Sequence, residues 1–137
     1  QVLDMMRGLK EKYGTAMILI THDLGVVAEV CSSVAIMYAG EIVEMGRLED
    51  IYLHPRHPYT VGLFRSIPDL DSTAERLEII PGLMPDPTNL PEGCSFCTRC
   101  QYATDRCRTT LPPVSADADG HQVRCWLQKD REEASNG

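Results

Sequence analysis

Cysteine is the residue type whose spacing in this chain best suits the chemistry of a site. The sequence holds six cysteines, and four of them lie in the phrase GCSFCTRCQYATDRC, which runs from Gly93 to Cys107. Cys125 follows in the phrase Val-Arg-Cys-Trp. Soft thiolates gathered this closely select Zn²⁺ or an iron-sulfur cluster over cations that prefer oxygen ligands. A set of four thiolates serves both, so the spacing leaves these two alternatives open.

A histidine that follows an apolar run is the second candidate site residue. The run from Ala16 to Ile20 is short and apolar throughout, which predicts a strand buried on both faces of a parallel sheet. Open α/β folds bind their ligands at the carboxyl ends of such strands. His22, in the phrase Thr-His-Asp, is therefore a candidate to contact a phosphate or to orient water. The alternative is a hydrogen-bonded turn residue.

Periodicity and helix breakers predict the elements that position these groups. Apolar residues three and four apart predict an amphipathic helix over 1–13, with Gly14 at its C-cap. Two strand-like runs joined at Ala39-Gly40 predict a β-hairpin. The prolines after Ile67 exclude a continuous helix and favour an extended linker. The other predictions are a helix over 24–31, hairpin strands over 33–38 and 41–45, and helices over 48–53 and 59–66, the last with Pro58 in its first turn.

Charge and hydropathy exclude two classes of interaction. The net charge is −7 and the isoelectric point is near 5.0, so the chain lacks the basic field of a nucleic-acid binder, and nucleic acid is not expected as a partner. No apolar run approaches the roughly 18 residues of a membrane span, and the first residues lack the pattern of a signal peptide. In an unexported chain the cysteines favour metal ligation or redox chemistry over disulfides.

The segment 19–46, LITHDLGVVAEVCSSVAIMYAGEIVEMG, resembles the stretch that ends the nucleotide-binding domain of ABC transporters. The resemblance implies an α/β fold class, as the C-terminal portion of an ABC-type P-loop domain. It also implies that His22 is the catalytic switch-loop histidine, which senses the γ-phosphate of ATP. The phosphate loop, the signature motif and the Asp-Glu pair that precede this stretch in the family do not occur in the chain. The chain alone is therefore predicted neither to bind ATP tightly nor to hydrolyse it.

A second phrase narrows the family. The segment LHPRHPYT, residues 53–60, resembles a phrase typical of the ATPases of oligopeptide, dipeptide and nickel importers. Its two histidines, His54 and His57, suggest a metal site at first. Pro55 and Pro58 prevent the pair from presenting both rings on one regular helix face. We therefore interpret the phrase as structural, with Tyr59 packing at a helix start.

The cysteine phrase resembles the C-terminal extension of the same peptide-importer ATPases, which is associated with a [4Fe-4S] cluster. That resemblance implies iron-sulfur rather than zinc. A small Pro-rich extension has little core, so we expect the cluster to have a structural role, with redox sensing as the alternative. Cys97 is surplus to the family pattern, and Cys31 is interpreted as a small buried hydrophobe. His121 is a ligand candidate if the ion is Zn²⁺, and otherwise a solvated loop residue. The ligands that the resemblance implies are Cys94, Cys100, Cys107 and Cys125.

The resemblance implies the organisation of the chain and of the complete protein. That protein would be an ATPase that uses ATP and Mg²⁺ to drive peptide uptake. Its partners would be a second ATP-binding subunit, transmembrane permease subunits and, indirectly, a periplasmic or lipoprotein peptide-binding protein. It would be peripheral to the cytoplasmic face of the inner membrane. The competing hypothesis is a non-enzymatic zinc-binding interaction module. The expected divisions are the end of the ATPase domain at 1–66, a Pro-rich linker at 67–93, an iron-sulfur extension at 94–128 and a disordered tail at 129–137.

Overall fold

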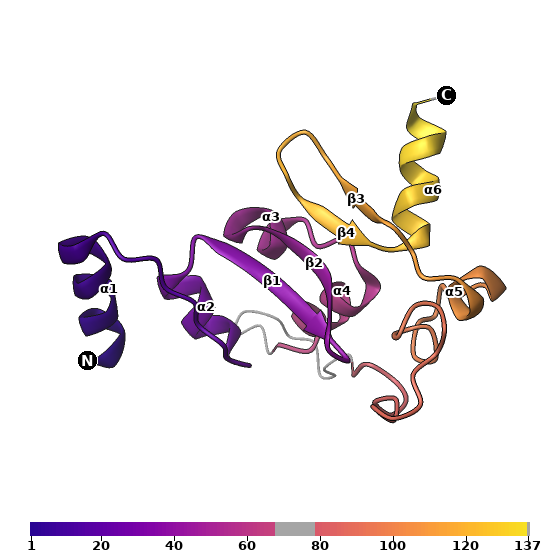
Figure 1. The fold of residues 1–137 in the computed structure, drawn as a ribbon, viewed down its shortest axis with the longest axis horizontal. Helices are drawn as coiled ribbons and strands as arrows, with labels where there is room; N and C mark the ends of the chain where they lie inside the picture. Colours follow the sequence, from indigo (N-terminus) through magenta and orange to yellow (C-terminus); the bar gives the residue numbers. More distant parts are fainter. Residues whose placement is uncertain (68–78, 137) are drawn as a thin grey trace, which may run out of the picture.

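The computed structural model describes residues 1–67 and 79–136. These residues form a mixed α/β structure built around a twisted antiparallel sheet, with α1 at one end of the molecule and α5 and α6 at the other (Figure 1). None of the described helices combines the length and apolar composition that crossing a membrane would require. The elements are α1 (Val2–Tyr13), α2 (Leu24–Val30), β1 (Ser33–Tyr38), β2 (Glu41–Arg47), α3 (Leu48–Leu53), α4 (Pro58–Arg65), α5 (Asp105–Thr109), β3 (Val114–Ala116), β4 (Gln122–Arg124) and α6 (Trp126–Ser135).

The predicted hairpin is confirmed, and it forms half of the sheet. β1 pairs with β2 through a turn at Ala39 and Gly40, whose φ angles of 48° and 81° are positive. Positive φ at both turn residues matches the right-handed twist of the flanking strands. The strand order β1-β2-β4-β3 then brings the C-terminal hairpin against β2, with Glu44 opposite Val123. The sheet therefore crosses the predicted boundary between the 1–66 and 94–128 regions.

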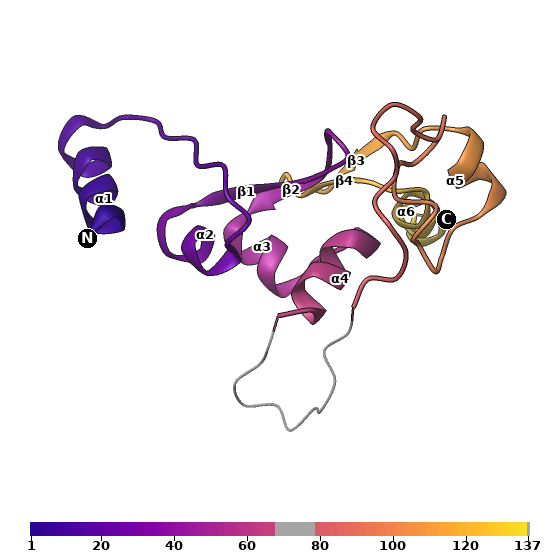
Figure 2. The same ribbon diagram turned by 90° about the horizontal axis from the view of Figure 1, so that it is seen from below.

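The core lies between the hairpin and the helices on one face of the sheet (Figure 2). Side chains of β1 alternate between exposed and buried, as expected for a strand with one face on the core. Ile51 of α3 is fully buried, and the hydroxyl of Tyr52 donates to the carbonyl of Leu24, which ties α3 to α2. The buried apolar cluster consists of Val27, Val34, Ile36, Tyr38, Val43, Ile51 and Phe96.

The helices predicted from local pattern are confirmed. α1 ends at Gly14, whose φ of 60° is left-handed, and α2 begins at Asp23, whose carboxylate accepts from the amide of Val26 at 3.1 Å. α4 begins with Pro58, as expected for the first turn of a helix. Within the linker predicted at 67–93, the described part from 79 onward contains neither helix nor strand. Residues 68–78 lie outside the described residues.

The buried strand predicted at 16–20 is wrong. This segment is irregular, and the side chains of Ile18 and Ile20 are 91% and 93% exposed. A strand exists only where neighbouring backbone pairs with it, and no described segment pairs with this one. α1 likewise has no buried residue, and it reaches the rest of the chain through Arg7, which donates to the carbonyl and the carboxylate of Glu29, each at 3.1 Å.

The disordered tail predicted at 129–137 is also wrong over most of its length. Residues 126–135 form the helix α6, which begins with the buried Trp126. The indole nitrogen of Trp126 donates to the carbonyl of Thr110 at 2.9 Å, and the guanidinium of Arg106 stacks 3.4 Å from the ring centroid. These contacts to residues of the α5 region stabilise a helix whose polar sequence does not predict it.

Candidate metal centre

Five cysteines line one pocket at the end of the molecule opposite α1. They come from three places in the chain: the turns between 93 and 101, the short helix α5 and the residue before α6. All are free thiols. The fold therefore brings together every cysteine that the sequence grouped with the phrase at 93–107. The five are Cys94, Cys97, Cys100, Cys107 and Cys125.

Backbone hydrogen bonds hold the first and last cysteines of the phrase side by side. The amide of Cys94 donates to the carbonyl of Cys107 at 2.8 Å, and the amide of Gly93 donates to the carbonyl of Arg108 at 3.2 Å. A Cβ atom on Gly93 would stand 2.2 Å from the carbonyl oxygen of Cys107. Only glycine allows this close approach of two backbone segments, which explains the glycine at the start of the phrase.

Burial shapes the acidity of these thiols. It is the main reason that the pKa of Cys94 is raised to about 12, and the neighbouring thiolate charges of Cys125, Cys97 and Cys107 contribute to that value. Burial also raises the pKa of Cys97, Cys100 and Cys125. The thiols are therefore close enough to repel one another when ionised. A bound cation offsets that repulsion, because its positive charge stabilises the thiolates that form when the coordinated thiols lose their protons.

The spacing of the described side chains is not that of a single-ion site. No group of three or more His, Cys, Asp or Glu residues among the described residues could hold one metal ion as placed. Thiolates on one tetrahedral Zn²⁺, each at about 2.3 Å from the ion, would stand about 3.8 Å apart. The cysteines thus share a pocket without forming a preassembled mononuclear site.

Phe96 and Arg99 attach the cysteine phrase to the rest of the fold. The ring of Phe96 is 3% exposed and meets Tyr38 and Tyr59 edge-on or tilted, with ring centroids 5.2 and 5.5 Å away. The guanidinium of Arg99 donates to the carbonyls of Pro81 at 3.0 Å and Ile80 at 3.3 Å. These contacts give a packing role to the aromatic and basic residues of the phrase.

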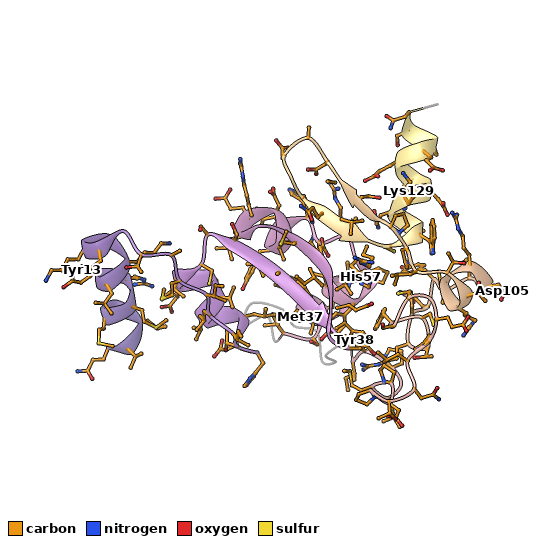
Figure 3. All side chains as sticks on the ribbon, in the orientation of Figure 1. Tyr13, Met37, Tyr38, His57, Asp105 and Lys129 are labelled. Atoms are coloured by element: carbon orange, nitrogen blue, oxygen red, sulfur yellow. The ribbon has the colours of Figure 1, made fainter. Side chains whose placement is uncertain are left out.

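His57 forms part of the wall of the same pocket (Figure 3). Its side chain is 1% exposed, and its Nδ1 accepts from the amide of Tyr59 at 3.0 Å, which caps α4. Burial lowers the pKa of His57 to about 4, so the ring is neutral at pH 7. This cap agrees with the interpretation of the phrase 53–60 as structural. Sequence reasoning missed that His57 lines the same pocket as the cysteines, because this depends on contacts between distant segments.

His121 is not a solvated loop residue, as the sequence suggested, and it does not line the cysteine pocket. It is 2% exposed, and its Nε2 lies 2.6 Å from a carboxylate oxygen of Glu44. The other interactions of Glu44 are with the amides of Arg56 at 2.8 Å and His57 at 2.9 Å. A buried carboxylate needs such partners, and the pairing of β2 with β4 supplies His121.

The remaining candidate residues lie away from the pocket. His22 is exposed in the irregular segment before α2, and α2 lies at the opposite end of the hairpin from the cysteine phrase (Figure 1). Cys31 caps the end of α2 and packs against the apolar core, in agreement with its interpretation as a small hydrophobe. His54 is exposed. The structure therefore separates the candidate catalytic histidine from the candidate metal ligands.

Comparison with known proteins supports one family. The sequence model described as "Oligopeptide/dipeptide transporter, C-terminal region" matches residues 43–107. The oligopeptide transport ATP-binding protein AppD of Bacillus subtilis is 45% identical over 130 residues, which make up 95% of this chain and 40% of that protein. The dipeptide transport ATP-binding protein DppD of Escherichia coli is 43% identical over 130 residues, with the same coverage of both chains.

A third relative gives the same picture. The oligopeptide transport ATP-binding protein OppD of Haemophilus influenzae is 44% identical over 131 residues, which cover 96% of this chain and 40% of the relative. The chain thus spans about 40% of the length of the curated relatives it matches. The similarity extends beyond residues 43–107 to nearly the whole chain.

Proposed function

Since this chain is the C-terminal region of an oligopeptide/dipeptide transporter ATP-binding protein, we propose that the complete protein is an ABC-type ATPase. It couples ATP hydrolysis to the uptake of oligopeptides or dipeptides. It works at the cytoplasmic face of the membrane with a second ATP-binding subunit and permease subunits, and a peptide-binding protein delivers the cargo. Relatives named for oligopeptide and for dipeptide transport support this substrate class.

Within that protein His22 acts at the γ-phosphate of ATP. The resemblance of segment 19–46 to the end of an ABC nucleotide-binding domain supports this role. The exposure of His22 in the described chain is consistent with it, because a histidine that contacts ATP must be reachable by the nucleotide. ATP and Mg²⁺ are held by the phosphate loop and carboxylates of the complete subunit.

The cysteine pocket holds a [4Fe-4S] cluster, and the observation that carries this assignment is the convergence of five thiols on one pocket. The ligands are Cys94, Cys100, Cys107 and Cys125, and Cys97 is a free thiol beside them. Four thiolates match the ligand set of a [4Fe-4S] cluster, in which each thiolate binds a different iron atom.

The role of the cluster is structural. When bound, it supplies cross-links between thiolates that are far apart in the chain, and with them folding free energy. The chain itself needs this help, because 79–101 contains no helix or strand and α5, β3 and β4 are short. The cluster region is linked to the sheet by contacts of Phe96 and Arg99 with Tyr38, and to α6 by the contact of Trp126 with Thr110.

Metal analysis of the complete subunit, purified without oxygen, tests the cluster. We expect about four irons and four acid-labile sulfides per chain, with a visible absorption band that Cys107→Ser abolishes. Cys31→Ser is the matched control, because Cys31 lies outside the pocket and should leave the iron content unchanged. Stoichiometric zinc without sulfide would contradict the cluster and favour the zinc-binding alternative.

A further inference from the structure

His57 carries a buried hydrogen-bond donor that no described protein atom accepts. The ring proton of neutral histidine sits on one nitrogen, and the other nitrogen accepts hydrogen bonds. Nδ1 of His57 accepts from the amide of Tyr59 at 3.0 Å, so the proton is on Nε2. Nε2 is buried and has no hydrogen-bond partner among the described residues. Leaving such a donor unpaired costs about 1–3 kcal/mol, so an acceptor is expected nearby.

The ring is held firmly in this orientation. The amide of His57 donates to the buried carboxylate of Glu44 at 2.9 Å, which fixes the backbone. The cap to Tyr59 fixes Nδ1, and the ring of Phe96 lies 5.8 Å away between centroids. Because backbone and ring are both fixed, the Nε2–H cannot turn toward solvent to find water. His57 lines the same pocket as the cysteines, so a group bound in that pocket is a candidate acceptor.

We propose that Nε2–H of His57 donates a hydrogen bond to a sulfur of the metal group that the cysteines hold. The inference rests on the proposed cysteine centre and adds to it a non-ligand residue that tunes it. Thiolate and sulfide sulfurs carry negative charge, and hydrogen bonds to ionised acceptors are about twice as strong as neutral ones. A sulfur of that group would satisfy the unpaired donor.

The proposed hydrogen bond affects the reduction potential of the cluster. Reduction adds negative charge to an iron-sulfur cluster, so a donor aimed at its sulfur stabilises the reduced form more than the oxidised form. His57 therefore raises the reduction potential of the cluster. His57 also caps the start of α4, and its backbone amide donates a hydrogen bond to Glu44. The phrase 53–60 therefore connects the ATPase part of the chain to the metal centre.

Two substitutions separate the donor from the helix cap. In His57→Asn the side-chain oxygen can replace Nδ1 and keep the cap, but no group reaches the position of Nε2. In His57→Gln the amide nitrogen reaches the position of Nε2 and can still donate. His54→Asn is the matched control, because His54 belongs to the same phrase and is exposed.

The test is redox titration of the complete subunit, followed by electron paramagnetic resonance, after iron and sulfide have been measured. We expect His57→Asn to favour the oxidised cluster about tenfold at a given potential, which is a fall of 59 mV for one electron. His57→Gln should stay closer to the unsubstituted protein, and His54→Asn should match it. Equal potentials in His57→Asn and the unsubstituted protein would overturn the proposal. Loss of the cluster in His57→Asn but not in His57→Gln would support it, and loss in both would overturn it by indicating a packing role.

A measurement without substitution gives an independent check. Pulsed electron paramagnetic resonance of the reduced cluster in protein labelled with ¹⁵N-histidine should show a coupled nitrogen, and His57→Gln should remove it. If the unsubstituted protein holds zinc instead, the proposed cluster is wrong and chelator competition tests the His57 contact separately. Weaker zinc binding in His57→Asn than in His57→Gln would support the contact, and equal binding would overturn it. A protein that binds neither metal would overturn both proposals.

Discussion

Glu44 connects three parts of the chain through one buried carboxylate. It belongs to β2, accepts from the backbone amides of Arg56 and His57, and contacts Nε2 of His121, the residue before β4. The neighbouring Arg56 also pairs with Asp117 at 2.5 Å, in the turn that leads to His121. These polar contacts fix the phrase 53–60 against the C-terminal hairpin. The orientation of His57 in the pocket wall is a result of that fixing.

The buried His57 predicts a pH dependence of stability. Its pKa is about 4 in the folded chain and 6.5 in the unfolded chain, so the unfolded state binds more protons between these values. Stability from this residue is full above pH 6.5 and falls as the pH drops toward 4, by about 3 kcal/mol. Urea unfolding of the chain at pH 7, 5.5 and 4.5 measures the free energy of unfolding. We expect the free energy of unfolding to fall less steeply with decreasing pH in His57→Asn than in the unsubstituted chain. Equal slopes would contradict the assignment of this pH dependence to His57.

At the scale of elements, the pairing of β2 with β4 joins the two regions that the sequence separates. The contact is short, with Glu44 opposite Val123 and Met45 opposite Gln122. It nevertheless places the residue before α6, Cys125, beside the phrase at 93–107. The hairpin of β3 and β4 is therefore the element that completes the pocket.

The antiparallel contact of Gly93 and Cys94 with Cys107 and Arg108 predicts a sensitive position. We expect Gly93→Ala to separate these two segments, because its Cβ would meet the Cys107 carbonyl at 2.2 Å, and to reduce bound iron strongly. The control is Gly8→Ala in α1, where a Cβ meets nothing within 4 Å. That control should stabilise the chain by about 0.4–1 kcal/mol and keep its metal. Normal iron content in Gly93→Ala, measured by metal analysis, would show that the close approach is not needed.

At the scale of the whole molecule, the apolar surface is unevenly covered. The sheet and α2 to α4 share a core, whereas the segment 1–20 leaves large apolar side chains exposed. The exposed apolar residues of this segment include Val2, Met5, Leu9, Tyr13, Met17, Ile18 and Ile20. In the complete subunit proposed above, we expect other parts of the nucleotide-binding domain to cover these side chains.

The catalytic motifs that the chain and the complete subunit contain predict the ATPase activity of each. The 137-residue chain contains no phosphate loop, so we expect no ATP hydrolysis above background when it is assayed alone. The complete subunit should hydrolyse ATP, and His22→Ala should lower its kcat by about 100-fold or more. His54→Ala, at another exposed histidine, is the control and should leave kcat unchanged. A phosphate-release assay measures ATP hydrolysis by the chain and by the complete subunit. ATP turnover by the chain alone would contradict the prediction that hydrolysis requires the phosphate loop.

The sequence by itself determined the features that depend on neighbouring residues. The helix ending at Gly14, the hairpin around Gly40 and the helix beginning at Pro58 follow from caps, turns and fixed φ angles. The grouping of cysteines in the phrase at 93–107 and the peptide-transporter family also follow from it, and the family comparison confirms the latter. Sequence pattern is sufficient for these because their energetics are local.

The tertiary structure decided the features that depend on distant partners. The apolar run at 16–20 is exposed because no described strand pairs with it, although its composition predicts a buried strand. The polar segment at 129–135 is helical, and contacts from Trp126 to distant residues stabilise the start of that helix. His57 and His121 differ in surroundings, because His57 lines the cysteine pocket whereas His121 pairs with Glu44. Burial and pairing across long sequence separations made these choices, and no local pattern encodes them.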